Sequence, residues 1–254
     1  MKNLINWKLF FILVIACVIA SLLVIPYSLA LTSAEIELTP LILIASAAQS
    51  LVLFAIATFF GLFISKRIGM GLPILEGVLQ RENEFKEFKL ILLPSVSLGV
   101  LAGVLILVLS YPFNKLIPEF QDMKILVPAW KGFLASFYGG IAEEVLLRLF
   151  LVSLIAWIFY KIKKSKDGTP PIFGIWIAII LSAIIFGLGH LPATAQIVEL
   201  NTIVVLRAIV LNGVGGIIFG WLYWKKGLEA AIIAHFSTDI VLHVITPFII
   251  SLFI

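Results

Sequence analysis

Three short groups of ionisable residues lie inside long apolar stretches of the sequence. They read Glu143-Glu144-Val-Leu-Leu-Arg148, Phe186-Gly-Leu-Gly-His190 and His235-Phe-Ser-Thr-Asp239. A charge in the middle of a membrane costs at least about 2.5 to 3.5 kcal/mol, so ionisable residues there are candidates for function by default. Carboxylates and imidazoles bind and release protons near neutral pH. The three groups therefore predict acid–base chemistry within the bilayer.

The first group contains two carboxylates with different prospects. Helical geometry places Glu144 and Arg148 four residues apart on one face, where they can form an ion pair. Glu143 lies off that face and is left without a cation, so it has reason to bind a proton or polarise a water molecule. The alternative is that all three charges form a buried network that only stabilises the bundle.

The chain has three histidines, and all of them fall in apolar stretches. A single histidine near a helix end, such as His190, is often a packing residue, but here two further histidines also lie in apolar stretches. His235 and Asp239 share a helix face through their i,i+4 spacing, which also fits an interhelical hydrogen bond or a proton relay. His243 continues this stripe; it either lines the same cavity or, as we slightly favour, packs between helices.

The elements that must position these residues are membrane-spanning helices. The chain is 62% hydrophobic and 13% charged over 254 residues, outside the range of soluble domains. We expect an all-α integral membrane protein, a single polytopic domain over residues 1–254, built as a bundle of seven to eight transmembrane helices with an intramembrane polar cavity. The expected spans are about 9–31, 41–65, 90–110, 132–159, 173–194, 203–224 and 228–254, and Pro247 with Ser237 and Thr238 could divide the last.

Smaller features concern packing and the surface. In the sixth span, Gly216 and Gly220 have the Gly-x-x-x-Gly spacing typical of close helix contacts. Arg207 is expected to reach the interface or to meet Glu199. The polar stretch 66–89 is a candidate amphipathic surface helix. Cys17, the one cysteine, can form no intrachain disulfide.

Basic residues alternate between the loops in a way that predicts orientation. We interpret the first span as a signal anchor rather than a cleaved signal, because its apolar run is too long for a signal h-region. One side carries Lys2, Lys8, Lys66, Arg67, Arg81, Lys86, Lys89, Lys161, Lys163, Lys164, Lys166, Lys225 and Lys226; the other carries Glu35, Glu37, Glu119, Asp122 and Glu199 with only Lys115, Lys124 and Lys131. The positive-inside rule then predicts a cytoplasmic N-terminus, in the cell membrane if the chain is prokaryotic. A nucleic-acid partner is not expected, because no soluble domain exists to carry a basic patch.

In this order, the three groups resemble the CAAX prenyl endopeptidase and bacteriocin-processing (CPBP, also called Abi) family of intramembrane proteases. The family pattern is Glu-Glu-x-x-x-Arg, Phe-x-x-x-His and His-x-x-x-Asn or Asp, and the match covers about residues 132–243. The resemblance implies an intramembrane endopeptidase in which Glu143 and His190 activate water while His235 and Asp239 stabilise the oxyanion. Glu144, Arg148 and Phe186 would support them. The implied partner is a membrane-associated peptide or protein, with or without a lipid, either CAAX-type and prenylated or bearing a leader peptide.

Asp239 stands where an asparagine is common in the family, and an ionised aspartate cannot donate a hydrogen bond to an oxyanion. It must be protonated, orient His235 or bind a metal. Glu143, His190, His235 and Asp239 would make an acceptable zinc set. Because Glu143 already provides a base, we prefer a mechanism that requires no cofactor, with zinc as the open alternative.

Two further questions stay open at the level of the sequence. The same ionisable residues could serve a transporter, which inverted repeats would favour, or a non-catalytic peptide-binding scaffold. The depths of the motifs also disagree, because His190 lies about 26 Å along its span and His235 only about 11 Å along its own. A tilted or recessed fifth span, or a last helix that begins nearer Trp224, would bring them level. The side to which the site opens is therefore undetermined.

Overall fold

All regular elements of the chain are helices in the computed structural model, which describes residues 5–32, 37–122, 127–163 and 168–253. No strand occurs within these ranges, so the predicted all-α class is confirmed. The physical reason is that hydrocarbon offers no partner to backbone N–H and C=O groups, and a helix satisfies them within one segment.

Seven helical stretches in the described ranges are long and apolar enough to cross a membrane. They are Trp7–Leu31, Pro40–Ser65, Phe85–Leu116, Ala129–Ile162, Ile172–Thr194, Thr202–Lys226 and Leu228–Ser251. The protein is thus an integral, multi-pass membrane protein, and the lower of the two predicted helix counts holds for the described residues. Large apolar side chains cover its outer surface, where lipid would bury them; Leu41 and Leu93 are exposed by 74% and 72%.

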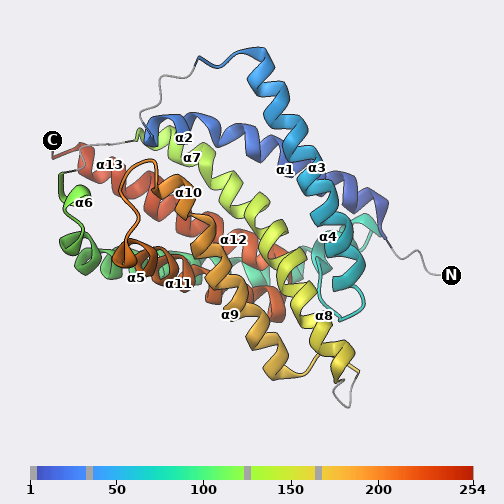
Figure 1. The fold of residues 1–254 in the computed structure, drawn as a ribbon. Helices are drawn as coiled ribbons and strands as arrows, with labels where there is room; N and C mark the ends of the chain where they lie inside the picture. Colours follow the sequence, from blue (N-terminus) through green and yellow to red (C-terminus); the bar gives the residue numbers. More distant parts are fainter. Residues whose placement is uncertain (1–4, 33–36, 123–126, 164–167, 254) are drawn as a thin grey trace.

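The spans consist of the following elements in chain order (Figure 1): α1 Trp7–Leu23, α2 Ile25–Leu31, α3 Pro40–Ser65, α5 Phe85–Leu116, α7 Ala129–Phe137, η1 Tyr138–Glu143, η2 Val145–Val152, α8 Ser153–Ile162, α9 Ile172–Gly189, α10 Leu191–Thr194, α11 Thr202–Lys226, α12 Leu228–Asp239, η3 Ile240–Ile245 and α13 Thr246–Ser251. Two short helices lie between spans, α4 Pro73–Leu79 and α6 Pro118–Asp122. The predicted surface helix over 66–89 is not continuous: the stretch contains the seven residues of α4 and the first turn of α5, which begins at Phe85.

The fourth and seventh spans contain π-helical segments, which the sequence analysis did not anticipate. In the fourth span η1 and η2 flank Glu144, and in the seventh η3 follows Asp239 directly. Hydrogen bonds in a π-helix run from i to i+5 and are found mostly as short segments, frequently at functional sites. The polar residues and Pro247 do not divide the last span into two; its irregularity is the η3 segment.

Small residues let the helices of the C-terminal half approach closely. A Cβ atom added at Gly216 would lie 2.6 Å from the Cβ of Ala183 on α9, and one added at Gly220 would lie 2.9 Å from Ile179 on the same helix. The predicted close packing of the sixth span is confirmed, and its partner is α9. The helix α11 also packs against α5 and α12, so α12 is held between α11, α5 and the fourth span.

The seventh span begins inside the protein. Gly227 ends α11 with a φ of 97°, a value that favours glycine, and α12 starts at the next residue. Leu228 is fully buried, and its N–H donates to the carbonyl of Gly71 at 2.9 Å. The Glu229 carboxylate accepts from the N–H of Leu75 at 2.8 Å. The chain around α4 therefore covers the start of α12 and recesses it from the surface.

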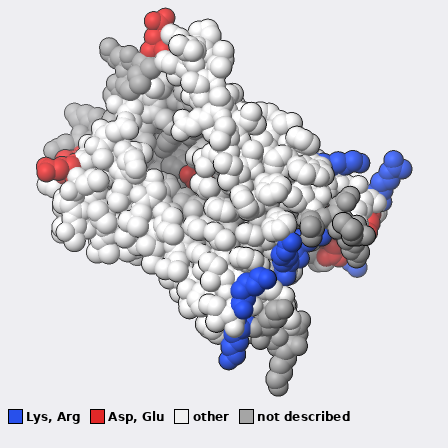
Figure 2. Space-filling view, turned by 45° about the vertical axis from the view of Figure 1, so that its right-hand side comes forward, with Lys and Arg blue, Asp and Glu red and all other residues white. Residues whose placement is uncertain are grey.

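Lysine and arginine side chains gather towards one end of the helices on the face that Figure 2 shows, and some acidic side chains lie among them. We call the end marked by Lys8, Lys66, Arg67, Lys86, Lys89, Lys161, Lys163, Lys225 and Lys226 the basic end. The opposite, acidic end carries the exposed Glu37, Glu119 and Glu199. Lys2, Glu35, Lys124, Lys164 and Lys166 lie outside the described residues.

Candidate active site

A cavity of about 780 Å³ lies among the helices and contains the four side chains to which the sequence analysis gave chemistry. Glu143 enters it from η1, His190 from the end of α9, and His235 and Asp239 from α12. Figure 2 shows the hollow near the centre of one face, with acidic atoms inside it. The structure therefore brings together residues that are up to 96 positions apart in the chain, from 143 to 239.

Glu144 and Arg148 form an ion pair in the protein interior, with NH1 of the arginine 2.9 Å from Oε1 of the glutamate. Glu144 is fully buried and Arg148 is 1% exposed. The guanidinium also lies over the rings of Phe186 and Phe219, at 5.2 and 5.4 Å from their centroids. Two charges taken out of water in this way depend on each other, because either alone would be costly.

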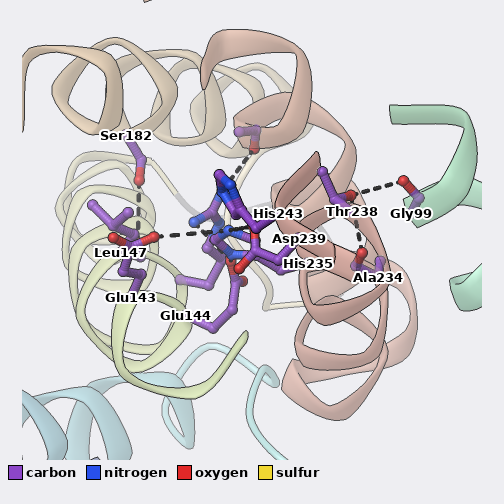
Figure 3. A network of polar contacts seen from close by, with 12 residues as sticks. Gly99, Glu143, Glu144, Leu147, Ser182, Ala234, His235, Thr238, Asp239 and His243 are labelled. Carbon is purple, nitrogen blue, oxygen red and sulfur yellow. Dashed lines mark hydrogen bonds and ion pairs between the residues drawn. The ribbon is translucent and has the colours of Figure 1, made fainter. Parts of the chain in front are cut away.

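His235 connects this ion pair to the cavity (Figure 3). Its Nδ1 lies 2.7 Å from the Glu144 oxygen that also faces Arg148, so the ring donates an N–H there. Phe219 stacks on the imidazole with 4.6 Å between the ring centroids. Glu144 was expected to pair only with Arg148, and its contact with His235 could not be seen from spacing along the chain.

The other nitrogen of His235 faces two carboxylates. Nε2 lies 3.7 Å from Glu143 Oε2 and 3.7 Å from Asp239 Oδ1. The Glu143 side chain is 20% exposed, whereas its neighbour Glu144 is fully buried. Two adjacent glutamates thus point into different surroundings, one into the interior and one into the cavity.

His190 lies at the C-terminal cap of α9, the helix end at which the cavity begins. Its Nδ1 is 2.9 Å from the carbonyl oxygen of Phe186, and because a carbonyl only accepts, this nitrogen carries the proton. In a neutral imidazole Nε2 then keeps its lone pair. Within the described residues no hydrogen bond or ion pair joins His190 to Glu143, so the two line the cavity without touching.

The mismatch in depth between His190 and His235 has a structural explanation. The two depths were compared as if the fifth and seventh spans both started at the same surface. Because α12 starts beneath α4, its first turns are already within the protein, and His235 lies deeper than its position along the helix suggests. The expected alternative, a last helix that begins nearer Trp224, is wrong, because α11 runs to Lys226 and α12 begins at Leu228.

Asp239 lies against residues of two other segments, and a third segment contacts one of those residues. Its Oδ1 lies 3.9 Å from Nε2 of His243, and Nδ1 of His243 lies 2.9 Å from the hydroxyl of Tyr27 on α2. Gly139 on η1 faces the carboxylate so closely that an added Cβ would collide with Oδ2. His243 therefore lines the cavity, the less favoured of its two readings. The sequence analysis missed Tyr27 and Gly139, since neither residue type is unusual in an apolar span.

Arg207 is also part of the cavity wall. Its Nε donates to the side-chain oxygen of Asn114 at 3.1 Å, and its guanidinium lies over the Phe120 ring at 4.4 Å. The expected contact with Glu199 is replaced by these two, because the end of α5 and α6 lie beside the start of α11.

The four cavity residues do not form a preformed zinc site. Across the described ranges, no group of three or more His, Cys, Asp or Glu side chains is arranged to hold a metal ion. One nitrogen of His235 is already engaged by Glu144, and His190 contacts none of the other three. The arrangement does not fit a tetrahedral N/O set at the usual distances of about 2.0 to 2.2 Å, and we derive no step through a metal.

Comparison with known proteins gives one match. The family model of type II CAAX prenyl endopeptidases, Rce1-like, matches residues 125–241. No curated protein and no solved structure shows a significant match to the chain. The matched segment contains all three motifs and stops two residues before His243. It supports a CAAX-type intramembrane protease at the level of the family. Residues 125–241 are thus Rce1-like, and the resemblance to the CPBP family predicted from the order of the three motifs is confirmed.

Proposed function

We propose that the chain is an intramembrane endopeptidase that hydrolyses a peptide bond of a membrane-associated substrate, with Glu143, His190, His235 and Asp239 as its catalytic residues. The observation that carries the proposal is their convergence on one cavity among membrane-spanning helices. Helices that placed these side chains on separate faces would have favoured a transporter or a scaffold. Their convergence favours the protease.

Glu143 and His190 are proposed to activate the attacking water. Both are partly accessible from the cavity, and the lone pair on His190 Nε2 and the Glu143 carboxylate can each accept a proton from water. The attacking water is proposed to lie between these two side chains, both of which line the cavity. The water then attacks the substrate carbonyl, and the proton that it loses passes to the base. The tetrahedral intermediate collapses with cleavage of the C–N bond, and the base returns this proton to the leaving amine.

His235 is proposed to donate from Nε2 to the oxyanion that forms on the substrate carbonyl. Because its Nδ1–H is engaged by Glu144, the ring donates from both nitrogens only as an imidazolium. Donors fixed in advance in a low-dielectric site contribute about 2.7 to 4 kcal/mol each to the transition state. Asp239 lies beside the same Nε2, a position that suits orienting His235 better than donating to the oxyanion itself.

The substrate is proposed to be a membrane-anchored peptide of the CAAX-type prenylated class or one with a leader peptide, processed by a single membrane domain. The gathering of lysine and arginine at one end in Figure 2 supports a cytoplasmic basic end, and with it a cytoplasmic N-terminus. Seven spans would then put the C-terminus on the other side of the membrane.

The test is hydrolysis of a membrane-presented peptide by the purified, reconstituted chain. Glu143→Ala and His190→Ala should each reduce turnover at least about a hundredfold, the contribution of a general base. Glu199→Ala, an exposed carboxylate at the acidic end, is the matched control and should leave turnover unchanged. Wild-type turnover by both cavity variants would refute the mechanism.

Chelation separates the two routes to an activated water. Turnover should persist in the presence of a zinc chelator, because the base is Glu143 and no metal is required. Loss of turnover on chelation and its recovery with added zinc, together with zinc bound in metal analysis, would overturn the metal-free route.

A further inference from the structure

The cavity is built only from those parts of the helices that lie far from the basic end. The first span starts at Trp7 beside Lys8, but it contributes only from Val24 onwards, the residue between α1 and α2. The helix α5 starts beside Lys86 and Lys89, and its cavity residues are Ile106, Leu107 and Ser110, in its last third.

The C-terminal spans follow the same rule. The fourth span ends near Lys161, and its cavity residues lie in its first half, at Ala135, Tyr138, Gly139 and Glu143. The sixth span ends at Lys226, and its cavity residues run from Arg207 to Phe219. The fifth and seventh spans contribute from Phe186 and His235 onwards, away from their basic starts. No residue of the basic end lines the cavity.

From this placement we infer that the cavity opens on the membrane face opposite the basic end, the non-cytoplasmic face, and that the substrate is a translocated, membrane-anchored peptide that enters from that face. The inference rests on the proposed function for what happens to the peptide and on the proposed orientation for the name of the face, whereas the placement of the cavity away from the basic end rests on the cavity lining. Figure 2 agrees with it, since the hollow lies nearer the acidic groups than the lysines and arginines.

The chemistry of the cavity wall suits such a peptide. Leu29, Leu31, Ile106 and Leu107 provide apolar surface for the side chains of an anchor segment, and Gln196 and Arg207 add polar groups for a peptide backbone. A cytoplasmic CAAX protein would have to carry its C-terminus past the buried Glu144–Arg148 pair to reach Glu143 from the basic end. A leader peptide cleaved after translocation already lies on the side of the opening.

Cysteine labelling tests the side of access without a substrate. Cys17 is the one cysteine of the chain and is fully buried, so the wild type measures the background. The variants are Ser28→Cys and Gln196→Cys, two exposed residues of the cavity wall, and Gln80→Cys, an exposed residue at the end of α4 next to the basic end. Each is treated with a membrane-impermeant maleimide in intact cells and in inverted membrane vesicles.

We expect Ser28→Cys and Gln196→Cys to react in intact cells and Gln80→Cys only in inverted vesicles. The reverse pattern would overturn the inference. A second measurement uses one anchored reporter peptide that presents its cleavage site on either face. Cleavage of the non-cytoplasmic form alone, lost in Glu143→Gln, supports the substrate class, and cleavage of the cytoplasmic form alone overturns it. If neither form is cleaved while labelling is as expected, the proposed function fails and the side of access stands.

Discussion

Glu143 and Glu144 are neighbours in the chain, but they belong to two regions with different physics. Glu144 is part of a buried network with Arg148 and His235, in which each charge has a fixed partner. Glu143 and His190 form what we call the cavity pair, whose accessible atoms face space that a water or a peptide can occupy. A charge inside a membrane protein can therefore either stabilise the fold or take part in a reaction, depending on the residues around it.

The largest effect should come from the buried network. Glu144→Gln leaves the Arg148 guanidinium buried without a counter-charge, which costs about 3 to 5 kcal/mol. Unfolding of the purified protein in detergent, followed by heat or denaturant, measures the change. Glu143→Gln is the matched control and should leave stability nearly unchanged while it abolishes turnover. Equal destabilisation by the two variants would erase the distinction between the regions.

A second substitution disturbs the point at which the two regions meet. Gly139→Ala puts a methyl group against the Asp239 carboxylate, and overpacking of this kind costs about 1 to 3 kcal/mol. Gly213→Ala is the control, because nothing lies within 4 Å of a Cβ at that position and the helix gains propensity. Gly139→Ala should lower both turnover and the free energy of unfolding, and Gly213→Ala should lower neither. A Gly139→Ala protein with wild-type properties would mean that Asp239 is not held where we describe it.

Asp239 belongs to both regions, because it lies in the wall of the cavity and also contacts the buried His235. If it orients His235, an asparagine can keep much of that contact, and kcat/KM of Asp239→Asn should fall by less than about tenfold, or 1.4 kcal/mol. The kcat/KM of Asp239→Ala should fall further. An asparagine variant as inactive as the alanine variant would instead assign the carboxylate a direct part in the chemistry.

The smallest effect is expected from the outer end of the same chain of contacts. Tyr27→Phe removes the hydroxyl that meets Nδ1 of His243, a hydrogen bond of about 0.5 to 1.5 kcal/mol. Tyr111→Phe, at an exposed tyrosine outside the cavity, should change unfolding by less. Identical unfolding curves for the two variants would show that Tyr27 contributes nothing to the position of His243.

Much of the fold could be predicted because hydropathy encodes it directly. The expected spans agree with the observed ones to within a few residues at most ends, for example 203–224 against Thr202–Lys226. Segments such as α3 have no alternative in lipid to a continuous helix. The third span was expected too short, because the lysines and the prolines at its ends look like loop residues in the sequence, yet α5 includes them.

The candidate site was partly predictable for a similar reason, since every buried charge in a membrane requires an explanation. The cost of Glu143, His190 and His235 made them visible in the sequence. Tyr27 and Gly139 carry no such cost, and only the packing of α2 and η1 against α12 gives them importance. The side of the opening, which we infer, was not visible either, because it depends on which parts of several spans line the cavity and not on any one residue.

The residue number of the fourth span also fixes its phase. In an α-helix each residue turns the chain by about 100°, so the loss of one residue within α8 would rotate the residues that follow it relative to Glu143. The span would remain apolar and long enough to cross the bilayer, and its hydropathy would be almost unchanged. The directions in which its side chains point would change. Selection on such a span therefore acts on residue number as strictly as on residue type, and single-residue deletions there should be far less tolerated than substitutions among apolar residues.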